Sequence, residues 1–552
     1  MDQITAFSLG EQFPLPLPEL LSTYNPALQT ASKKHSSIGS SAVAVASGIL
    51  MSRIVGLIRE RVFAHYLGSS ETADAFRAAL RIPNFLQNLF GEGVLSASFI
   101  PVYARLNAEH RHEEASEVAE AIFGLLFVTT TILVTIGIIA TPWLIDAIAP
   151  GFHGDKRLLT IELVRILFPG TGLLVFSAWC LGILNSHRKF LLSYTAPVLW
   201  NAAIIATFIW KGSQPESRLA ADVAWGSVVG SALQFVAQLP AVLGFLWPLR
   251  IRLRSSSNHV RVVVKNFFPV FVSRGVVQIS SYIDGILASF LPTGAVADFG
   301  YALTLITLPV SLFGMSVSAA ELPTMSSALG TNEEIAAALR KRLAAGLQQI
   351  AYFVVPSAVA FVILGDVVVA TIFRSGAFKA TDVMYVWAVV AGSAVGLLAS
   401  TSGRLYSSAF YALRNTRTPL NFAMIRVALT LALGYVFALP LPRLLGINGR
   451  LGVAGLTLSA GIAGWLEFLL LRRALHRDIG VVSYSVTRVM KLWLAAIVAA
   501  LIAYGIKRAL PFHRPLLVGP AVLIPYAALY LGFTQLMGIS TVGGLMRRFT
   551  RR

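Results

Sequence analysis

The sequence has little charge and almost no cysteine. Only 13% of its 552 residues are Asp, Glu, Lys or Arg, against roughly a quarter in soluble domains. The single cysteine, Cys180, excludes a disulfide scaffold and argues against a cysteine-ligated metal centre. Walker-type glycine loops, catalytic-triad spacings and metal-binding motifs are absent as well. The sequence therefore predicts a protein that is not an enzyme and that uses no metal or other cofactor.

What the sequence has instead is a succession of long apolar runs. It is 56% hydrophobic, with a mean hydropathy of +0.71. One membrane crossing takes about 20 apolar residues, and the runs are spaced for about 14 such helices. The predicted crossings span residues 40–66, 75–103, 118–147, 158–184, 190–210, 219–247, 262–291, 296–326, 343–372, 382–412, 418–438, 451–471, 489–506 and 516–537. The predicted fold class is an all-α polytopic membrane protein.

The few charged residues are unevenly placed. Residues 1–38 are polar and contain several prolines, which predicts a disordered cytoplasmic extension. Basic residues gather in alternate connections and in the C-terminal tail: Arg250, Arg252, Arg254, Arg261, Lys265, Arg472, Arg473, Arg477, Arg488, Lys491, Arg547, Arg548, Arg551 and Arg552. Because cytoplasmic connections are enriched in Lys and Arg, both termini are predicted to be cytoplasmic. The same placement accounts for the net charge of +19 without a nucleic-acid partner.

Short motifs recur in the same order along the two halves of the chain. The matches are Ser52-Arg53 with Ser273-Arg274, Pro101 with Pro323, Phe152 with Phe378, and Arg188 with Arg417. Their separations increase slowly, as a duplicated unit with small insertions would produce. An even number of helices per unit makes the two repeats parallel. We therefore predict six-helix bundles in residues 39–250 and 251–475 around a central cavity, then two further helices and a basic tail in residues 476–552.

Charged residues interrupt the first predicted crossing. The stretch SRIVGLIRERVF, residues 52–63, directly follows an apolar run. Ser52, Arg53 and Glu60 share one helical face, and Arg59 lies beside that face. A charge at the bilayer centre costs at least ~2.5 kcal/mol, so such residues normally face a bundle interior or a wet cavity.

The second crossing carries a longer polar stripe. At ~100° per residue its members occupy one face of a helix: Asp74, Arg77, Arg81, Asn84, Asn88 and Glu92. Pro83 removes one intrahelical hydrogen bond and is expected to bend the helix. Stripes on two adjacent helices predict a shared hydrated cavity, with Arg274 and Asp284 on the facing bundle.

Several of these residues have a second interpretation. Arg77 and Arg81 could instead extend to water from the outer end of their helix. Glu92 could pair with an arginine of the preceding crossing without contacting a substrate. Asp284 could bind a coupling cation or a proton, or could be paired structurally. The residues alone leave these alternatives open.

Short motifs typical of one known family occur in order along most of the chain. They are Ser52–Glu60, Thr72-Ala-Asp-Ala-Phe76, Ile82-Pro-Asn84, Phe90-Gly-Glu-Gly93, Phe99-Ile-Pro101, Ala149-Pro-Gly-Phe152, Gly182-Ile-Leu-Asn-Ser186 with Phe190, Ala196-Pro197 with Asn201, and Thr418-Pro419. Together they resemble the lipid II flippases of the MurJ/MviN family over roughly residues 40–540. That family belongs to the multidrug/oligosaccharidyl-lipid/polysaccharide exporter superfamily, whose two-bundle architecture agrees with the internal repeat.

The resemblance implies a function. Family members carry lipid-linked peptidoglycan precursor from the inner to the outer leaflet of the bacterial cytoplasmic membrane, by alternating access driven by the membrane potential or a coupling cation. The implied partners are that anionic precursor, membrane lipids and the cell-wall synthesis machinery. Cavity arginines would bind the pyrophosphate, and a lateral portal with a groove along the last two helices would take the polyprenyl tail.

The candidate site residues fall into two groups. Candidates for substrate binding are Arg53, Arg59, Arg274, Asn84, Asn88 and Glu92. Candidates for gating or ion coupling are Ser52, Glu60, Asp74 and Asp284. Arginine suits a pyrophosphate because its forked donors bind phosphate oxygens bidentately and stay protonated.

Two positions depart from the family pattern. Gln87, shortly after the Pro-Asn of the second crossing, and Thr304, five residues before Pro309, stand where the better-known flippases have arginine. Arg274 is a candidate replacement for one of them. The alternatives are an ion-coupled exporter of a drug or another oligosaccharide-lipid, a membrane enzyme acting on a lipid-phosphate sugar, and a non-transporting paralogue. The surplus of arginine over acid argues against an exporter of cationic drugs.

Overall fold

The computed structural model describes residues 35–90, 92–246, 248–250, 252, 257–326, 331–482, 485–512 and 514–539, and within them all regular structure is helical. The first half comprises α1 (His35–Leu67), α2 (Glu71–Ala79), α3 (Arg81–Phe90), α4 (Glu92–Ser98), α5 (Ile100–Ala108), α6 (His112–Ile148), α7 (Gly154–Ser186), α8 (Phe190–Lys211) and α9 (Glu216–Leu243). The second comprises α10 (Asn258–Ser289), α11 (Ala295–Pro309), the π-helix η3 (Val310–Met315), α12 (Ser316–Ser326), α13 (Asn332–Ile363), α14 (Gly365–Phe373), α15 (Ala380–Ala412), α16 (Arg417–Ala438), α17 (Pro440–Leu444), the 3-10 turn η4 (Gly449–Leu451) and α18 (Gly452–Ile479). The last two helices are α19 (Val486–Ala509) and α20 (Pro515–Leu536).

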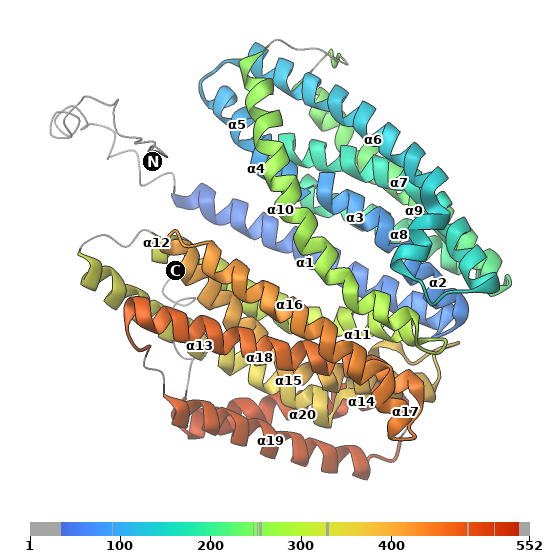
Figure 1. Cartoon of the computed structure of the whole chain (residues 1–552), viewed down its shortest axis with the longest axis vertical. Helices are drawn as coiled ribbons and strands as arrows, with labels where there is room; N and C mark the ends of the chain where they lie inside the picture. The colour runs from blue at the N-terminus through green and yellow to red at the C-terminus, as the bar shows by residue number, and fades with distance from the viewer. Residues whose placement is uncertain are drawn as a thin grey trace, which may run out of the picture.

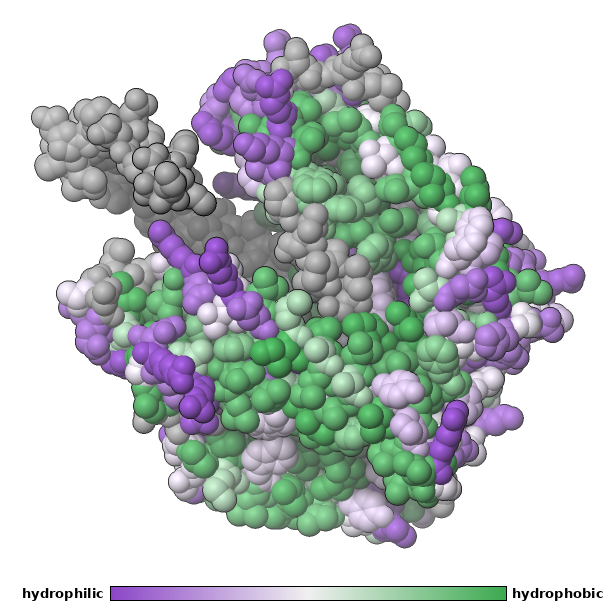
Figure 2. Space-filling model, viewed as in Figure 1, coloured by the Kyte–Doolittle hydropathy of each residue, from purple (hydrophilic) through white to green (hydrophobic). Residues whose placement is uncertain are grey.

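The helices have the length and composition of membrane spans. Among the described residues, 11 helices are long and apolar enough to cross a bilayer. The three remaining predicted crossings coincide with α1, with the segmented run α2–α5, and with α10. These three carry the charged residues of the stripes predicted from the sequence. Hydrophobic side chains gather over the middle of the helices and hydrophilic ones toward their two ends (Figure 2). The predicted all-α polytopic membrane fold is confirmed.

The helices form two lobes that converge at one end. Helices α1–α9 make the N-lobe and α11–α18 the C-lobe, with α19 and α20 packed against α13 and α14 (Figure 1). Helix α10 runs between the lobes, contacting α3, α4 and α6 on one side and α16 and α18 on the other. The lobes meet where α2, α11 and α14 lie and diverge toward the end at which the chain begins. We call these the closed end and the open end.

Equivalent helix ends support the internal repeat, with one correction. Helix α7 ends in a left-handed residue, Arg188, and α15 ends in the same way at Arg414. Both residues donate their N–H three residues back, to Asn185 and Tyr411. The spacing of these two arginines equals that of Phe152 and Phe378. The prediction that Arg188 matches Arg417 was therefore wrong; the left-handed turn that ends each helix identifies Arg414 as its equivalent.

The second predicted crossing is not one helix. It breaks at Leu80, where α2 ends and α3 begins. Pro83 explains the break, because its ring clashes with the carbonyl four residues earlier and it cannot donate to that carbonyl. The polar stripe predicted for one continuous face is consequently divided between the short helices α2, α3 and α4. The equivalent C-lobe helix is interrupted too, by a π-helix that follows Pro309.

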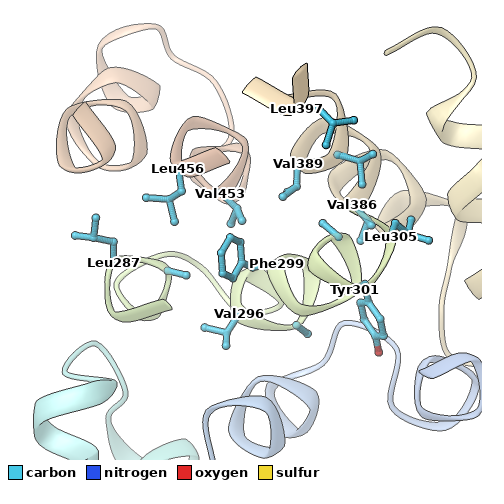
Figure 3. Close-up of a cluster of buried hydrophobic side chains, with 14 of the residues drawn as sticks. Leu287, Val296, Phe299, Tyr301, Leu305, Val386, Val389, Leu397, Val453 and Leu456 are labelled. Carbon is cyan, nitrogen blue, oxygen red and sulfur yellow. The ribbon is translucent and has the colours of Figure 1, made fainter. Parts of the chain in front are cut away.

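The C-lobe core surrounds α11. Phe299 and Leu305 of α11 belong to one buried cluster with Leu287 of α10, and α15 and α18 contribute side chains such as Val389 and Leu456 (Figure 3). Tyr301 points away from this cluster toward the N-lobe chain. Apolar burial therefore holds α11 in the C-lobe and leaves the hydroxyl of Tyr301 facing the other lobe.

Candidate functional site

Asp74 fastens the two lobes together at the closed end. It lies on α2 of the N-lobe and is completely buried. Its carboxylate accepts hydrogen bonds from the N–H groups of Gly294 and Ala297, each at 2.7 Å, at the start of α11. Lys156 of α7 pairs with the same carboxylate at 2.7 Å.

This arrangement is a helix cap supplied from another lobe. A helix leaves its first N–H groups without intrahelical partners, and a side-chain oxygen at the N-cap position usually accepts from one of them. The N-cap of α11 is Gly294, which has no side chain and adopts φ 91°. Asp74 provides the missing oxygens and a negative charge that the positive end of the helix favours.

A second acidic group joins the lobes beside it. Asp298 of α11 accepts a hydrogen bond from the hydroxyl of Ser69 in the N-lobe at 2.7 Å. Arg450 binds Asp298 at 2.7 and 3.0 Å and also reaches Asp382 at 3.1 Å. Tyr301 donates its hydroxyl to the carbonyl of Gly68 at 2.6 Å.

Backbone contacts complete the closure. The N–H of Ala377 donates to the carbonyl of His65 at 2.7 Å. Arg61 donates to the carbonyls of Thr371 and Ile372 at 2.8 and 2.7 Å. One apolar cluster continues through both lobes at this end, whereas the part of the N-lobe nearer the open end has its own core. The described contacts therefore seal the molecule at the closed end only.

Above this seal lies a group of three charged side chains. Glu60 of α1 is buried and binds Arg77, and it also accepts a hydrogen bond from Arg59 at 2.6 Å. Arg77 stacks over the rings of Phe63 and Tyr301, at 4.6 and 4.8 Å. The alternative prediction that Arg77 extends to water is wrong, because its side chain is only 14% exposed and binds Glu60.

Two members of this group, Arg59 and Glu60, line a cavity of about 710 Å³. Both lobes contribute to its wall: Ile49, Ser52, Arg53, Gly56, Leu57, Arg59, Glu60, Gln87, Leu174, Ser177, Ala178, Leu181, Ser193, Tyr194, Pro197, Trp200, Asn201, Gln234, Leu303, Thr304, Thr307 and Leu308. Arg59 lies 4.8 Å above the ring of Trp200. Arg53 is exposed and makes no ion pair with any described side chain. The wall therefore offers one guanidinium without an ion-pair partner among the described side chains and a second that is shared with Glu60.

Uncharged polar groups line the N-lobe wall. The hydroxyl of Ser177 accepts hydrogen bonds from the amides of Gln234 and Gln238 at 2.9 and 2.7 Å. Asn201 donates to the carbonyl of Pro197 at 2.9 Å, and its own side-chain oxygen is buried without a partner among the described atoms. Sequence reasoning did not propose Ser177, Gln234 or Trp200. Their signal is weak because single polar residues in a membrane helix do not form a stripe.

The structure distributes the predicted site residues over several places. Ser52, Arg53, Arg59 and Glu60 share the cavity, and Asp74 lies at the closed end. Gln87 and Thr304, the positions that depart from the family pattern, line the cavity as well. Their neighbours Asn84 and Asn88 are not among the lining residues.

The remaining three candidates are Glu92, Arg274 and Asp284. The side chains of Glu92 and Arg274 are outside the described residues, so their roles stay predictions. Asp284 is on α10, beside Gly285, where an added Cβ would overlap the guanidinium of Arg81. One oxygen of Asp284 and one nitrogen of Arg81 are buried without a hydrogen-bond partner among the described atoms.

This geometry suits the reversible binding of an anion. Arginines at membrane depth are costly unless they are paired or hydrated, and here they line a cavity with amides and hydroxyls. A doubly charged phosphate group could engage Arg53 and compete with Glu60 for Arg59. Since the closed end is held by polar contacts and a shared apolar cluster between the lobes, the same cavity could become accessible from the other side when these contacts break.

Comparisons with known proteins agree with this architecture. The family profile described as Lipid II flippase MurJ matches residues 63–522. A Burkholderia cenocepacia protein described as lipid II flippase MurJ is 32% identical over 512 residues, covering 89% of this chain and 95% of that protein. A probable lipid II flippase MurJ of Rhizobium meliloti is 30% identical, covering 83% of this chain and 85% of that protein.

Solved structures share the fold. A lipid II flippase MurJ in an inward closed conformation superposes with a TM-score of 0.73 at 24% identity, covering 90% of this chain and 98% of that one. An inward-facing multidrug resistance MATE transporter gives a TM-score of 0.61 at 18% identity, covering 79% and 98%. With a family match over most of its length, this chain belongs to the lipid II flippase MurJ family.

Proposed function

We propose that this protein flips lipid II, the lipid-linked peptidoglycan precursor, from the inner to the outer leaflet of the bacterial cytoplasmic membrane. The observation that carries the proposal is the arginine-bearing cavity, sealed at one end of the molecule by contacts between lobes. Family membership supports the choice of substrate. The protein would act as a transporter, with no bond made or broken in the precursor.

The orientation follows from charge. The open end lies on the side of the basic connections around Arg250, Arg252 and Arg261, which are typical of the cytoplasmic face. Both termini would then be cytoplasmic, and the closed end would face the periplasm. The cavity would load lipid II from the inner leaflet.

Binding and release would use the same charges. Arg53 and Arg59 would hold the pyrophosphate while the polyprenyl tail stays in lipid, along a portal between the lobes and a groove at α19 and α20. Release would require the Asp74 and Asp298 contacts to break and the lobes to converge at the other end. A coupling cation or the membrane potential, worth about 2.3 kcal/mol per charge per 100 mV, would drive the cycle.

Complementation tests this function. We expect the chain to rescue a bacterial host depleted of its own lipid II flippase, and Arg53→Ala and Arg59→Ala to fail at matched membrane levels. Loss of one charge-assisted contact should weaken lipid II binding by about tenfold. Arg157→Ala is the matched control, because Arg157 pairs at the surface with Asp146. If the parent neither rescues the host nor binds purified lipid II, the proposal fails in favour of another lipid-linked substrate or a non-transporting paralogue.

The two departures from the family pattern give a gain-of-affinity prediction. Gln87→Arg and Thr304→Arg would each add a guanidinium to the cavity wall. We expect each to tighten lipid II binding by about tenfold, measured by titration of the purified protein. Ser213→Arg, in an exposed connection, is the control for added charge. Unchanged affinity in both cavity variants would mean that the pyrophosphate lies elsewhere.

A further inference from the structure

A second, unassigned cavity opens on the outer surface of the N-lobe. It measures about 530 Å³ and lies between α7 and α9, away from the central cavity. Its lining residues are Leu158, Ile161, Glu162, Arg165, Ile166 and Trp225. The side chains of Leu158, Glu162 and Arg165 are exposed and recur at the spacing of one helical face. The groove therefore combines one acid, one base and one indole on a surface that faces lipid.

The two charges are not paired with each other. Glu162 has no hydrogen-bond or ion-pair partner among the described side chains. The single recorded polar contact of Arg165 is a long bond, 3.4 Å, to the carbonyl of Ile138 on α6. Charged side chains at membrane depth normally pair or face water. Glu162 and Arg165 lie one helical turn apart, and each therefore lacks a partner of opposite charge among the described side chains.

Their depth corresponds to the membrane interface. Helix α7 has 33 residues, so it is about 50 Å long and exceeds a hydrocarbon core of about 30 Å by roughly 10 Å at each end. Glu162 and Arg165 lie about 12 and 17 Å from its start at the closed end, so their Cα atoms are about 2 and 7 Å inside the core and their long side chains extend toward the headgroups. Trp225 lies about 14 Å from the start of α9. Tryptophan is enriched at this level, beside lipid headgroups.

We propose that this groove binds a zwitterionic phospholipid headgroup with a primary ammonium, as in phosphatidylethanolamine. The phosphate would accept hydrogen bonds from Arg165, and the ammonium, two carbons beyond, would donate to Glu162. Trp225 would pack beside the glycerol, and Leu158 and Ile166 against the acyl chains. The occupant is a structural lipid of the leaflet at the closed end, distinct from the transported precursor.

Lipid competition on the purified full-length protein tests this assignment. After delipidation in detergent, phosphatidylethanolamine should raise the unfolding temperature more than phosphatidylcholine, whose quaternary ammonium cannot donate, or phosphatidylglycerol, which has no ammonium. Arg165→Gln should weaken retention of all three lipids in native mass spectrometry by about three- to tenfold. Glu162→Gln should abolish only the preference for phosphatidylethanolamine.

Two control variants distinguish a specific loss of lipid binding from misfolding. Arg165→Lys should keep part of the binding, and Arg157→Gln, on the same helix but outside the groove, should bind as the parent does. Equal retention of the three lipids by the parent, or unchanged retention in Arg165→Gln and Glu162→Gln, would overturn the proposal. The latter result would fit a groove that receives a partner's transmembrane helix. Because the readout is binding of a bulk phospholipid, it is independent of lipid II transport.

Discussion

Replacing Asp74 with asparagine is expected to open the closed end and to abolish rescue of a flippase-depleted host. The carboxylate holds the N–H groups of Gly294 and Ala297 together with Lys156, all at 2.7 Å. Asparagine has one acceptor oxygen and no charge, so Lys156 would stay buried without a counter-ion. Removing one partner of a buried ion pair costs about 3–5 kcal/mol. The closed state would thus lose roughly a hundredfold to several thousandfold in population.

Cysteine labelling can measure that opening. In a Cys180→Ala background, Gln87→Cys places one thiol in the cavity, and a membrane-impermeant maleimide added from outside should label it faster with Asp74→Asn. Asp146→Asn, which breaks an exposed pair with Arg157, should leave labelling unchanged. If Asp74→Asn were labelled at the parental rate and still rescued the host, Asp74 would not have this capping role.

A companion substitution separates charge from capping. Asp74→Asn combined with Lys156→Met removes the stranded ammonium and should recover part of the unfolding temperature. It should not restore slow labelling, because the start of α11 would still lack its acceptor. Full recovery of both readouts would assign the whole effect of Asp74 to the ion pair.

Glu60→Gln is expected to have the second-largest effect. Glu60 is the only recorded acidic partner of Arg77 among the described side chains, and Arg77 is enclosed by the rings of Phe63 and Tyr301. Glutamine leaves the buried guanidinium with one neutral acceptor oxygen, no counter-charge, and its attraction to the rings, about 2 kcal/mol when desolvated. We expect a loss of about 3–5 kcal/mol in the free energy of unfolding, together with failure to rescue.

Thermal unfolding of the purified variants provides the measurement. Arg77→Met in the Glu60→Gln background should raise the unfolding temperature again, since the pair is removed as a unit. Glu109→Gln, which breaks an exposed pair with Arg105, is the control and should change stability by less than about 1 kcal/mol. An unfolding temperature of Glu60→Gln equal to that of the control would show that Arg77 does not depend on Glu60.

The helix content and the position of the charged stretch in α1 could be predicted from the sequence. Both depend on short-range patterns: the length of apolar runs, and residues spaced by one helical turn. The arrangement of the second crossing could not be predicted in this way. A constant 100° per residue requires an unbroken helix, and the break at Leu80 removes that condition for Asn84 and Asn88.

For the same reason, the sequence predicts only some of the residues that form the cavity wall. Gln87 was noticed because it departs from a family pattern, and the structure places it beside Arg53 and Arg59. Ser177 and Gln234 gave no such signal, since each is one polar residue in an apolar helix. They meet only because α7 and α9 pack against each other.

The sequence by itself determined that this chain is a polytopic helical membrane protein with a duplicated unit, charge inside the membrane and membership of a flippase family. Those properties follow from composition, periodicity and ordered motifs. Only the tertiary structure decided what the charges do. Asp74 caps α11 because the lobes converge at one end, and Glu60 of α1 binds Arg77 of α2 inside the packed N-lobe. In both places groups from different helices exclude water together. Burial makes such polar contacts strong, and burial is a property of the packed lobes.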